Sequence, residues 1–336
     1  MKVDIIVGGQ GGDEGKGKIA QYLSLKNNYD IVLRVSVPQA GHSIIYNGEK
    51  VGLATLPCGF INENSEIFIG RGSFISVSRL EEELKKTGLK NSKRVKIDNY
   101  ATIVTEEQRE RERQDSNLMG KIGSVGTGTG PSRISKIKRD EIVFAKDIPA
   151  LKNYLSDTVE EICEALKQGK KILLEGDHGF KLSLIHGEYP FVTSRDTTAS
   201  TFLGEAGINQ FEVRDVYLVL KPYVTRVAAG PLENEIVDEE KLEWFLKEGG
   251  ERGSVSRRKR RIGGFEWENA RRASMVNGAT KLCITHMDVF KGDKNEEINF
   301  LSKIDKELCS RYPYPEVSIL SYGPKINDIL DFDNID

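Results

Sequence analysis

Two acidic and two basic side chains lie inside a glycine-rich turn close to the start of the chain. The segment spanning residues 4–21 reads DIIVGGQGGDEGKGKIAQ and carries Asp13, Glu14, Lys16 and Lys18. The backbone N–H groups of such a turn, together with the dipole of a following helix, attract phosphate groups. Carboxylates beside them can bind a divalent metal or accept a proton. The turn therefore predicts a site where phosphate, a metal ion and a proton-transfer group meet.

Two better-known glycine motifs do not account for this turn. A P-loop, G-x-x-x-x-G-K-[ST], would need glycine in place of Gln10 and a hydroxyl residue in place of Gly17. Residues 15–20 match a dinucleotide-binding fingerprint weakly, and the next apolar run ends without the acid that would hold a ribose. A turn that only joins a strand to a helix is the plain alternative, and the interleaved acids and lysines disfavour it.

The elements that must position this turn alternate between strand-like and helix-like segments. This order predicts one α/β domain over residues 1–336, with a mainly parallel central sheet covered by helices, P-loop-NTPase-like in architecture and with long functional loops. The charge run at 105–115 has no apolar stripe, so we expect a solvated helix surface there. The expected strands are 4–7, 31–37, 67–70, 171–175, 216–220, 282–285 and 317–320, and the expected helices include 79–86, 159–166, 265–277 and 298–308.

The composition favours a soluble enzyme without a nucleic-acid or membrane partner. The chain has 336 residues, 49 Lys and Arg against 51 Asp and Glu, and a formal net charge of −2. No apolar run approaches the roughly 20 residues that span a bilayer. The chain starts directly with a strand-like run, so we expect no signal peptide. Its four cysteines are scattered without a CxxC pair, and we expect ordinary thiols in a reducing cytoplasm.

Several ordered blocks of the chain resemble the adenylosuccinate synthetase family, in particular its compact archaeal and bacteriophage forms. The family's opening block, GxxxGDEGKGK, appears at residues 8–18, and its NAGHT block resembles QAGHS at 39–43. Its phosphate loop, GTTGxGxGP, resembles residues 123–131. Later blocks are YPFVTS at 189–194, a serine and arginine loop at 254–261, and THMD at 285–288, where the family usually has TKLD.

The resemblance implies a carbon–nitrogen ligase that uses a nucleoside triphosphate, GTP or ATP. The family phosphorylates the 6-oxo group of a purine nucleoside monophosphate and then lets the amine of L-aspartate displace that phosphate. It implies three catalytic residues: Asp13 as the base for the N1 proton, His42 as a group able to carry a proton near neutral pH, and Lys16 against the phosphates. Mg²⁺ would be held by Asp13 and the carbonyl of Gly41. The remaining nucleotide- and phosphate-binding candidates are Gly12, Glu14, Gly15, Gly17, Lys18, Gln39, Ser124, Val125, Arg139, His178, Thr193, Asp288, Ser321 and Gly323.

The arginine-rich segment at 254–261 has more than one possible role. As a bare string it resembles a nucleic-acid patch or a solvated basic face, but the net charge and the absence of aromatic residues among the arginines disfavour a polynucleotide ligand. In the family the corresponding loop closes over the carboxylates of aspartate, which suits a guanidinium fork. The implied aspartate-binding residues are Ser254, Val255, Ser256, Arg258 and Arg260.

Arg139 falls where the family sends an arginine from the neighbouring subunit to the 5′-phosphate of the nucleotide. The resemblance therefore implies a homodimer with a shared active site.

The purine substrate is less well defined than the reaction. The turn at 193–196 and Arg257 resemble the bacteriophage branch, which acts on dGMP, whereas Asp13 argues for IMP because the phage enzymes carry serine there. We expect dGMP, with IMP as the alternative, and leave open both the donor and a viral origin with action in a host cytoplasm. The departures from the family pattern are Gln39 for asparagine, Val125 for threonine, Asp177-His178 for Ala-Gln, Arg257 for glycine, Gly264 for tryptophan and His286 for lysine.

Two other classes of protein share single features with this chain. An NAD-dependent Rossmann oxidoreductase would also begin with a strand, glycines and a helix, but it needs the missing ribose-binding acid. An RNA-binding module would share the arginine run but needs a cationic stripe that the composition does not supply.

Overall fold

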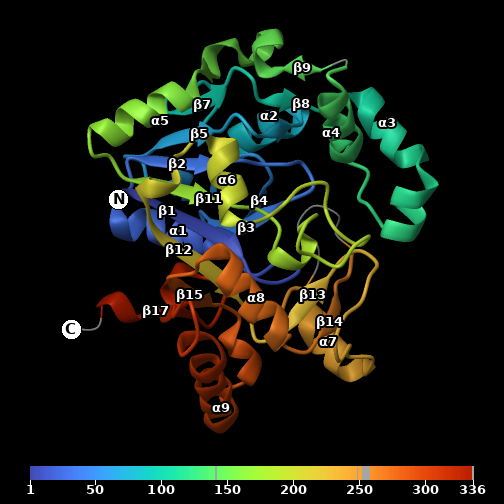
Figure 1. Cartoon of the computed structure of the whole chain (residues 1–336), viewed down its shortest axis with the longest axis vertical. Coiled ribbons are helices and arrows are strands. Elements are labelled where there is room, and N and C mark those ends of the chain that lie inside the picture. Colours follow the sequence, from blue (N-terminus) through green and yellow to red (C-terminus); the bar gives the residue numbers. More distant parts are fainter. Residues whose placement is uncertain (141, 248, 252–257, 335–336) are drawn as a thin grey trace.

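A ten-stranded sheet runs through the middle of the molecule (Figure 1). The computed structural model describes residues 1–140, 142–247, 249–251 and 258–334. Neighbouring strands of this sheet are parallel, apart from the edge pair β16–β17, which is antiparallel. This confirms the expected mainly parallel sheet. In spatial order the strands are β10 (Leu155–Ser156), β7 (Val95–Asp98), β5 (Glu66–Ile69), β2 (Ile31–Arg34), β11 (Ile172–Glu175), β1 (Val3–Gly8), β12 (Val213–Leu220), β15 (Lys281–Ile284), β16 (Glu316–Ser321) and β17 (Ile329–Asp331).

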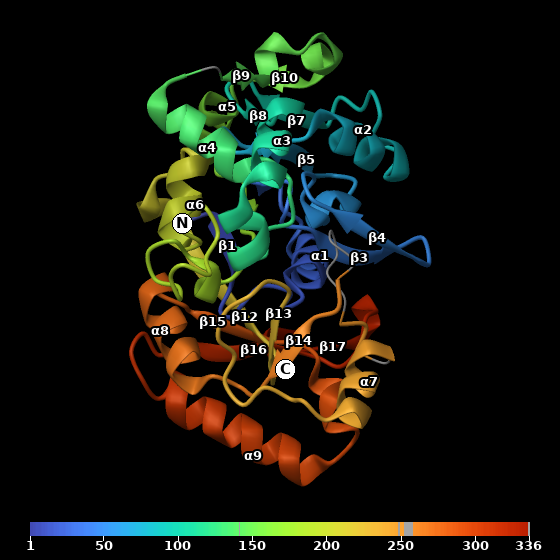
Figure 2. The same cartoon turned by 90° about the vertical axis from the view of Figure 1, so that its right-hand side faces the viewer.

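Helices cover both faces of this sheet, as Figure 2 shows from the side. Successive side chains of a strand point to opposite faces, so Val3, Ile5 and Val7 of β1 enter one apolar core and Ile6 enters the other. Side chains of α5, α6, α8 and α9 fill the first core, and those of α1 and α2 fill the second. The helices are α1 (Lys16–Asn27), α2 (Val77–Lys86), α3 (Glu106–Gln114), α4 (Thr129–Lys138), α5 (Thr158–Lys167), α6 (Ala199–Ala206), α7 (Glu239–Lys247), α8 (Trp267–Asn277) and α9 (Lys294–Ile304).

The carboxyl ends of the central parallel strands meet at one edge of the sheet, which is where open α/β sheets bind ligands. The glycine-rich turn follows β1 directly. Asp177 and His178 follow β11, Lys221 follows β12, Thr285 follows β15, and Ser321 ends β16. Segments that are far apart in the sequence therefore converge on one place because each is the continuation of a neighbouring strand.

Three small sheets lie outside the central one. The hairpin of β3 (His42–Tyr46) and β4 (Glu49–Leu53) brings His42 to the carboxyl edge. The antiparallel pair of β13 (Val224–Arg226) and β14 (Arg261–Gly263) is the second small sheet, and β14 begins at the last residue of the arginine-rich segment. The third contains β6 (Phe74–Ile75), β8 (Thr102–Ile103) and β9 (Val143–Phe144). No helix in the described part of the chain is long and apolar enough to cross a membrane.

The charged segment at 105–115 forms helix α3, but the expectation that it is a solvated surface is wrong for one of its faces. Gln108 and Glu112 are buried, with 4% and 3% of their surface exposed. A capping box begins the helix: the N–H of Gln108 donates to the hydroxyl of Thr105 at 3.3 Å, and the N–H of Thr105 donates to the Gln108 side chain at 3.0 Å. An apolar stripe is absent because this face buries polar groups that are hydrogen-bonded.

Candidate active site

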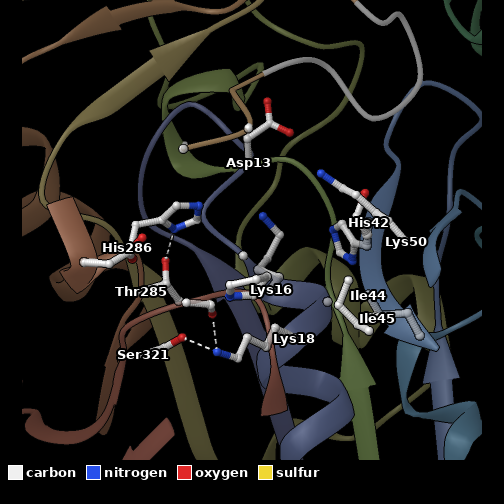
Figure 3. Close-up of a pocket in the computed structure, with 18 of the residues that line it drawn as sticks. Asp13, Lys16, Lys18, His42, Ile44, Ile45, Lys50, Thr285, His286 and Ser321 are labelled. Atoms are coloured by element: carbon white, nitrogen blue, oxygen red, sulfur yellow. Dashed lines mark hydrogen bonds between the residues drawn. The ribbon is translucent and has the colours of Figure 1, made fainter. Parts of the chain in front are cut away.

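Two adjoining cavities open at the carboxyl edge of the sheet. The first has a volume of about 300 Å³ and the second about 230 Å³. Four of the residues singled out in the sequence line both cavities: Asp13, Lys16, Gly41 and His42. Ligands in the two cavities would therefore meet at these residues. Figure 3 shows Asp13, Lys16 and His42 around the first cavity.

The glycine-rich turn is held from below by a buried carboxylate. Glu14 accepts hydrogen bonds from the N–H of Gln10 at 3.1 Å and from that of Gly12 at 2.9 Å, and the ammonium of Lys16 contacts its other oxygen. Burial raises the pKa of Glu14, but the charge and hydrogen bond of Lys16 outweigh burial and lower it overall. Glu14 lines neither cavity, so the structure shows it as a support for the turn, and its predicted role toward a nucleotide stays a prediction.

Asp13 lies at the top of the turn in a left-handed conformation, with φ of 62°. Oδ1 of Asp13 is 2.5 Å from Nη2 of Arg260. Arg260 is anchored in turn by Glu251, whose other oxygen lies 2.8 Å from Nζ of Lys221 and accepts a hydrogen bond from the hydroxyl of Tyr223 at 2.6 Å. Asp13 is thus the outer end of a chain of alternating charges that begins at a fully buried lysine.

Sequence reasoning missed Lys221 and Glu251. Lys221 carried a usable signal, since a charged residue that directly follows a buried strand lies at the carboxyl edge of a parallel sheet. Glu251 carried no such signal, because it is far from any strand in the sequence and reaches the site only through the fold.

His42 is fixed by a buried acid at the end of β11. Its Nδ1 lies 2.5 Å from Oε1 of Glu175, and the other Glu175 oxygen accepts from the N–H of Cys58 at 2.6 Å. Burial and the nearby Arg34 guanidinium lower the pKa of His42 to about 4, despite its bond to Glu175. The ring is therefore neutral at neutral pH in this structure, and the role of His42 as a proton carrier in the reaction stays a prediction. Its Nε2 is buried and has no hydrogen-bond partner among the described residues.

Cys58 lies closer to functional groups than its position in the sequence suggested. Its Sγ, a ring nitrogen of His42 and a carboxylate oxygen of Glu175 all lie within 4.8 Å of one another. Burial raises the pKa of the Cys58 thiol well above its ordinary value, so it stays protonated. Because both Glu175 oxygens already accept hydrogen bonds from His42 and Cys58, this cluster acts as a support for the histidine.

The second cavity is lined by several of the predicted nucleotide- and phosphate-binding residues. Oε1 of Gln39 accepts from the hydroxyls of Thr129 at 2.5 Å and Thr127 at 3.3 Å, so the amide nitrogen is turned toward Thr193, 3.4 Å away. The orientation of the amide is set by these hydroxyl donors. The other candidates that line this cavity are Gly12, Ser124, Val125 and His178.

A buried ion pair orients His178 from behind. Its Nδ1 lies 2.9 Å from Oδ1 of Asp177, and the same carboxylate pairs with the guanidinium of Arg195. Burial raises the pKa of Asp177, but the charges of Arg195 and His178 outweigh burial and hold it well below its usual range. Asp177 therefore stays ionised and fixes the imidazole at the wall of the second cavity.

Further nucleotide-binding candidates line the first cavity around the start of α1. Nζ of Lys18 donates to the hydroxyl of Ser321 at 2.7 Å and to the carbonyl of Gly323 at 2.5 Å (Figure 3). Burial lowers the pKa of Lys18 to about 8. His286 stands nearby where a lysine was expected, and burial together with Lys221 lowers its pKa to about 3, so it is neutral. Gly15, Gly17 and Asp288 also line this cavity.

Several predicted residues do not line either cavity. Arg139 is exposed at the carboxyl end of α4. Arg258 is exposed and donates to the carbonyls of Gly123 at 3.0 Å and Ser124 at 3.4 Å, so it reaches the loop beside the second cavity. Of the predicted aspartate-binding residues, Arg260 lines the first cavity. Ser254, Val255 and Ser256, together with Arg257, lie outside the described residues.

Solved structures with the same fold include two synthetases. The fully ligated adenylosuccinate synthetase from Plasmodium falciparum aligns with a TM-score of 0.90 at 22% identity, covering 98% of this chain and 100% of that chain. The cyanophage S-2L succinoaminodeoxyadenylate synthetase, bound to dGMP and to dATP as an energy donor, aligns with a TM-score of 0.82 at 25% identity. That alignment covers 98% of this chain and 95% of the phage chain.

Comparison of sequences confirms the resemblance that the motifs indicated. The family model described as adenylosuccinate synthetase matches residues 5–148 and 143–330. The adenylosuccinate synthetase of Methanosphaera stadtmanae is 37% identical over 343 residues, with 99% of each chain covered. That of Thermococcus onnurineus is 39% identical over 335 residues, with 97% of each chain covered. The chain therefore belongs to the adenylosuccinate synthetase family of carbon–nitrogen ligases.

Proposed function

We propose that this chain joins L-aspartate to the 6-position of IMP, driven by GTP through a 6-phosphoryl intermediate. The observation that carries the proposal is the position of Asp13, Lys16 and His42 where the two cavities adjoin. The second cavity, beside the 123–130 loop, suits the purine monophosphate, and the first, beside the start of α1, suits the triphosphate. Archaeal relatives named adenylosuccinate synthetase, which align over nearly the whole chain, favour IMP over our expectation of dGMP.

The proposed chemistry follows from the groups at the junction. Asp13 takes the N1 proton of the purine, which makes the 6-oxygen nucleophilic. Lys16 offers a cation to the transferring phosphoryl group, at the point where oxygen charge develops. His42 presents Nε2 to the same region, and an anionic phosphate beside it would raise its pKa and favour the protonated form. Arg260 pairs with Asp13 and, with Arg258, offers guanidinium groups to the carboxylates of aspartate.

The donor set at the junction fits Mg²⁺. A carboxylate oxygen of Asp13 and the carbonyl of Gly41 are the hard oxygen ligands that this ion prefers, and both residues line both cavities. A cation already neutralises Asp13 in the structure, since Arg260 lies 2.5 Å from it. We therefore infer that Asp13 and Gly41 would hold Mg²⁺, which would supply charge neutralisation to the phosphoryl group.

We also propose a homodimer in which Arg139 of one chain serves the second cavity of the other. Arg139 is exposed at the end of α4 and lines neither cavity of its own chain. The same helix exposes apolar side chains, with Ile134 at 54% and Ile137 at 78%. Exposed apolar groups beside a functional residue favour a subunit contact. A single domain over residues 1–336 remains our prediction, supported by a central sheet whose strands come from Val3 to Asp331.

dGMP is the second candidate substrate. Its support is the similarity to the phage synthetase bound to dGMP, which extends over 98% of this chain at 25% identity. The turn at 193–196, which resembles the phage branch, contributes Thr193 and Ser194 to the second cavity.

Phosphate release with L-aspartate and GTP, compared for IMP, dIMP, GMP and dGMP at equal concentration, decides between the substrates. We expect IMP to be turned over fastest. A pocket built for the 2-amino group of guanine would instead prefer dGMP over dIMP by about 10- to 100-fold, because dIMP lacks that group and leaves a buried acceptor unpaired. Turnover of none of the four nucleotides would overturn the proposed function.

A further inference from the structure

Glu112 is a buried acid on a helix whose other acids face solvent. It lies near the end of α3 and exposes 3% of its surface, whereas Glu106, Glu107 and Glu110 of the same helix are exposed. Both of its oxygens accept hydrogen bonds: one from the hydroxyl of Ser124 and one from the backbone N–H of Gly128. A buried carboxylate needs such donors, and here both come from the loop between α3 and α4.

That loop packs directly against α3. A Cβ at Gly128 would lie 2.8 Å from the backbone nitrogen of Arg109, and φ of 84° at Gly128 is itself a conformation that favours glycine. The capping box of Thr105 and Gln108 fixes where α3 begins, and so fixes the position of Glu112 along the helix. Helix α3 is therefore a support for the loop, and Glu112 is its point of attachment.

The loop itself borders the second cavity, and Glu112 also lines that cavity. Gly123, Ser124 and Val125 line it, and Thr129, the first residue of α4, donates to Gln39. The loop is thus held by an acid on one side and by the Gln39 amide on the other. A phosphate that binds to backbone N–H groups needs the loop to keep one shape, since its affinity depends on preformed donors.

We propose that Glu112 is a positioning residue for the phosphate group of the purine monophosphate, acting through Ser124 and Gly128. This inference rests on the proposed function, because it assigns the second cavity to that nucleotide. The carboxylate is specifically required, since each of its two oxygens accepts from a different donor. Glutamine keeps the size of the side chain but turns an NH₂ group toward one of these donors.

The test compares E112Q with E110Q in the full chain. Glu110 is on the same helix, is exposed, and pairs with surface groups in the described part of the chain, among them Arg113 at 3.4 Å and the Gln114 amide at 2.8 Å. We expect E112Q to raise the KM for the monophosphate and its Kd by about 10- to 100-fold, the effect of losing a charge-assisted hydrogen bond. The KM values for GTP and aspartate should stay within about twofold, and E110Q should match the wild type in all of them.

Comparing the KM changes for the three substrates distinguishes a positioning role of Glu112 from a general structural one. An equal rise in all three KM values, or an unchanged KM for the monophosphate in a folded E112Q chain, overturns the inference. A lower KM also overturns it, because Glu112 would then be competing with the phosphate for the loop. If E112Q does not fold, E112D serves instead: it keeps the carboxylate but shortens the side chain by one methylene group, which weakens both hydrogen bonds. We then expect a smaller rise confined to the monophosphate, and an unchanged KM would overturn the inference.

Direct binding by calorimetry, with IMP and dGMP as the probes, separates this inference from the proposed function. A wild-type chain that binds neither nucleotide overturns the proposed function and the role of Glu112 together. A wild-type chain that binds one of them while the E112Q chain binds it equally well overturns the role of Glu112 alone.

Discussion

Nη2 of Arg260 lies 2.5 Å from Oδ1 of Asp13, so the carboxylate at the junction of the two cavities is paired with a cation. The same guanidinium contacts Glu251, which also pairs with the fully buried Lys221. The position of the proposed base therefore depends on a charge network that extends into the protein interior.

Asp13→Asn should preserve the fold and nucleotide binding but abolish phosphoryl transfer. The amide has the same size, but it can neither accept the N1 proton nor supply a carboxylate to a metal ion. We expect phosphate release to fall about a thousandfold or more. Thermal shift with nucleotide measures the retained binding. Near-normal turnover in this variant would contradict the role of Asp13.

Glu251→Gln should destabilise the whole chain rather than only slow the reaction. It leaves Lys221 buried with no carboxylate partner, and losing one member of a buried ion pair costs about 3–5 kcal/mol. Urea denaturation measures the change in the free energy of unfolding. The matched control is Glu243→Gln, which breaks an exposed pair with Lys247 on α7 and should cost no more than about 0.5 kcal/mol. Equal stability of the two variants would show that the buried pair is not needed.

Binding of the triphosphate should weaken as the pH rises through about 8. Burial lowers the pKa of Lys18 to about 8, so Lys18 is charged below that pH and loses its proton above it. If its charge attracts the triphosphate, kcat/KM for GTP falls on the alkaline side, because that ratio reports the free enzyme. Lys18→Arg keeps its charge at high pH and should remove this decline. Identical alkaline limbs in both proteins would exclude Lys18 as the titrating group.

Mixing two inactive variants tests the shared active site. Arg139→Leu should weaken monophosphate binding while leaving each chain folded, since Arg139 is exposed. Mixed with Asp13→Asn chains, it should restore part of the activity, because one hybrid site would have both residues intact. Phosphate release after subunit exchange measures the rescue. Mixed dimers with no activity above either parent would rule out a site shared between subunits.

The local sequence pattern was sufficient to predict most strands of the central sheet, though not β7, β10 or β17, and most of its helices. The strands at 171–175 and 216–220 contain the apolar runs 172–174 and 216–220, and α8 appears as a run of helical spacing at 265–277, because burial on a sheet face imposes these patterns locally. The glycine-rich turn was also recognisable, since its glycines, acids and lysines are adjacent in the chain. Boundaries were less well predicted: α9 begins at Lys294, capped by Asp293, before the first apolar residue of the expected helix.

Only the tertiary structure decided what surrounds each functional side chain. His42 and Glu175 are separated by 133 positions, yet their contact keeps the ring oriented, and burial lowers the pKa of His42 to about 4, which its position in the sequence did not indicate. Glu112 seemed part of a solvated charge run until the fold placed the 123–128 loop against it. Such contacts depend on how separate strands and helices pack at the carboxyl edge, and burial there changes the charge states of side chains. The contacts and the charge states could therefore not be obtained from the spacing of residues along the chain.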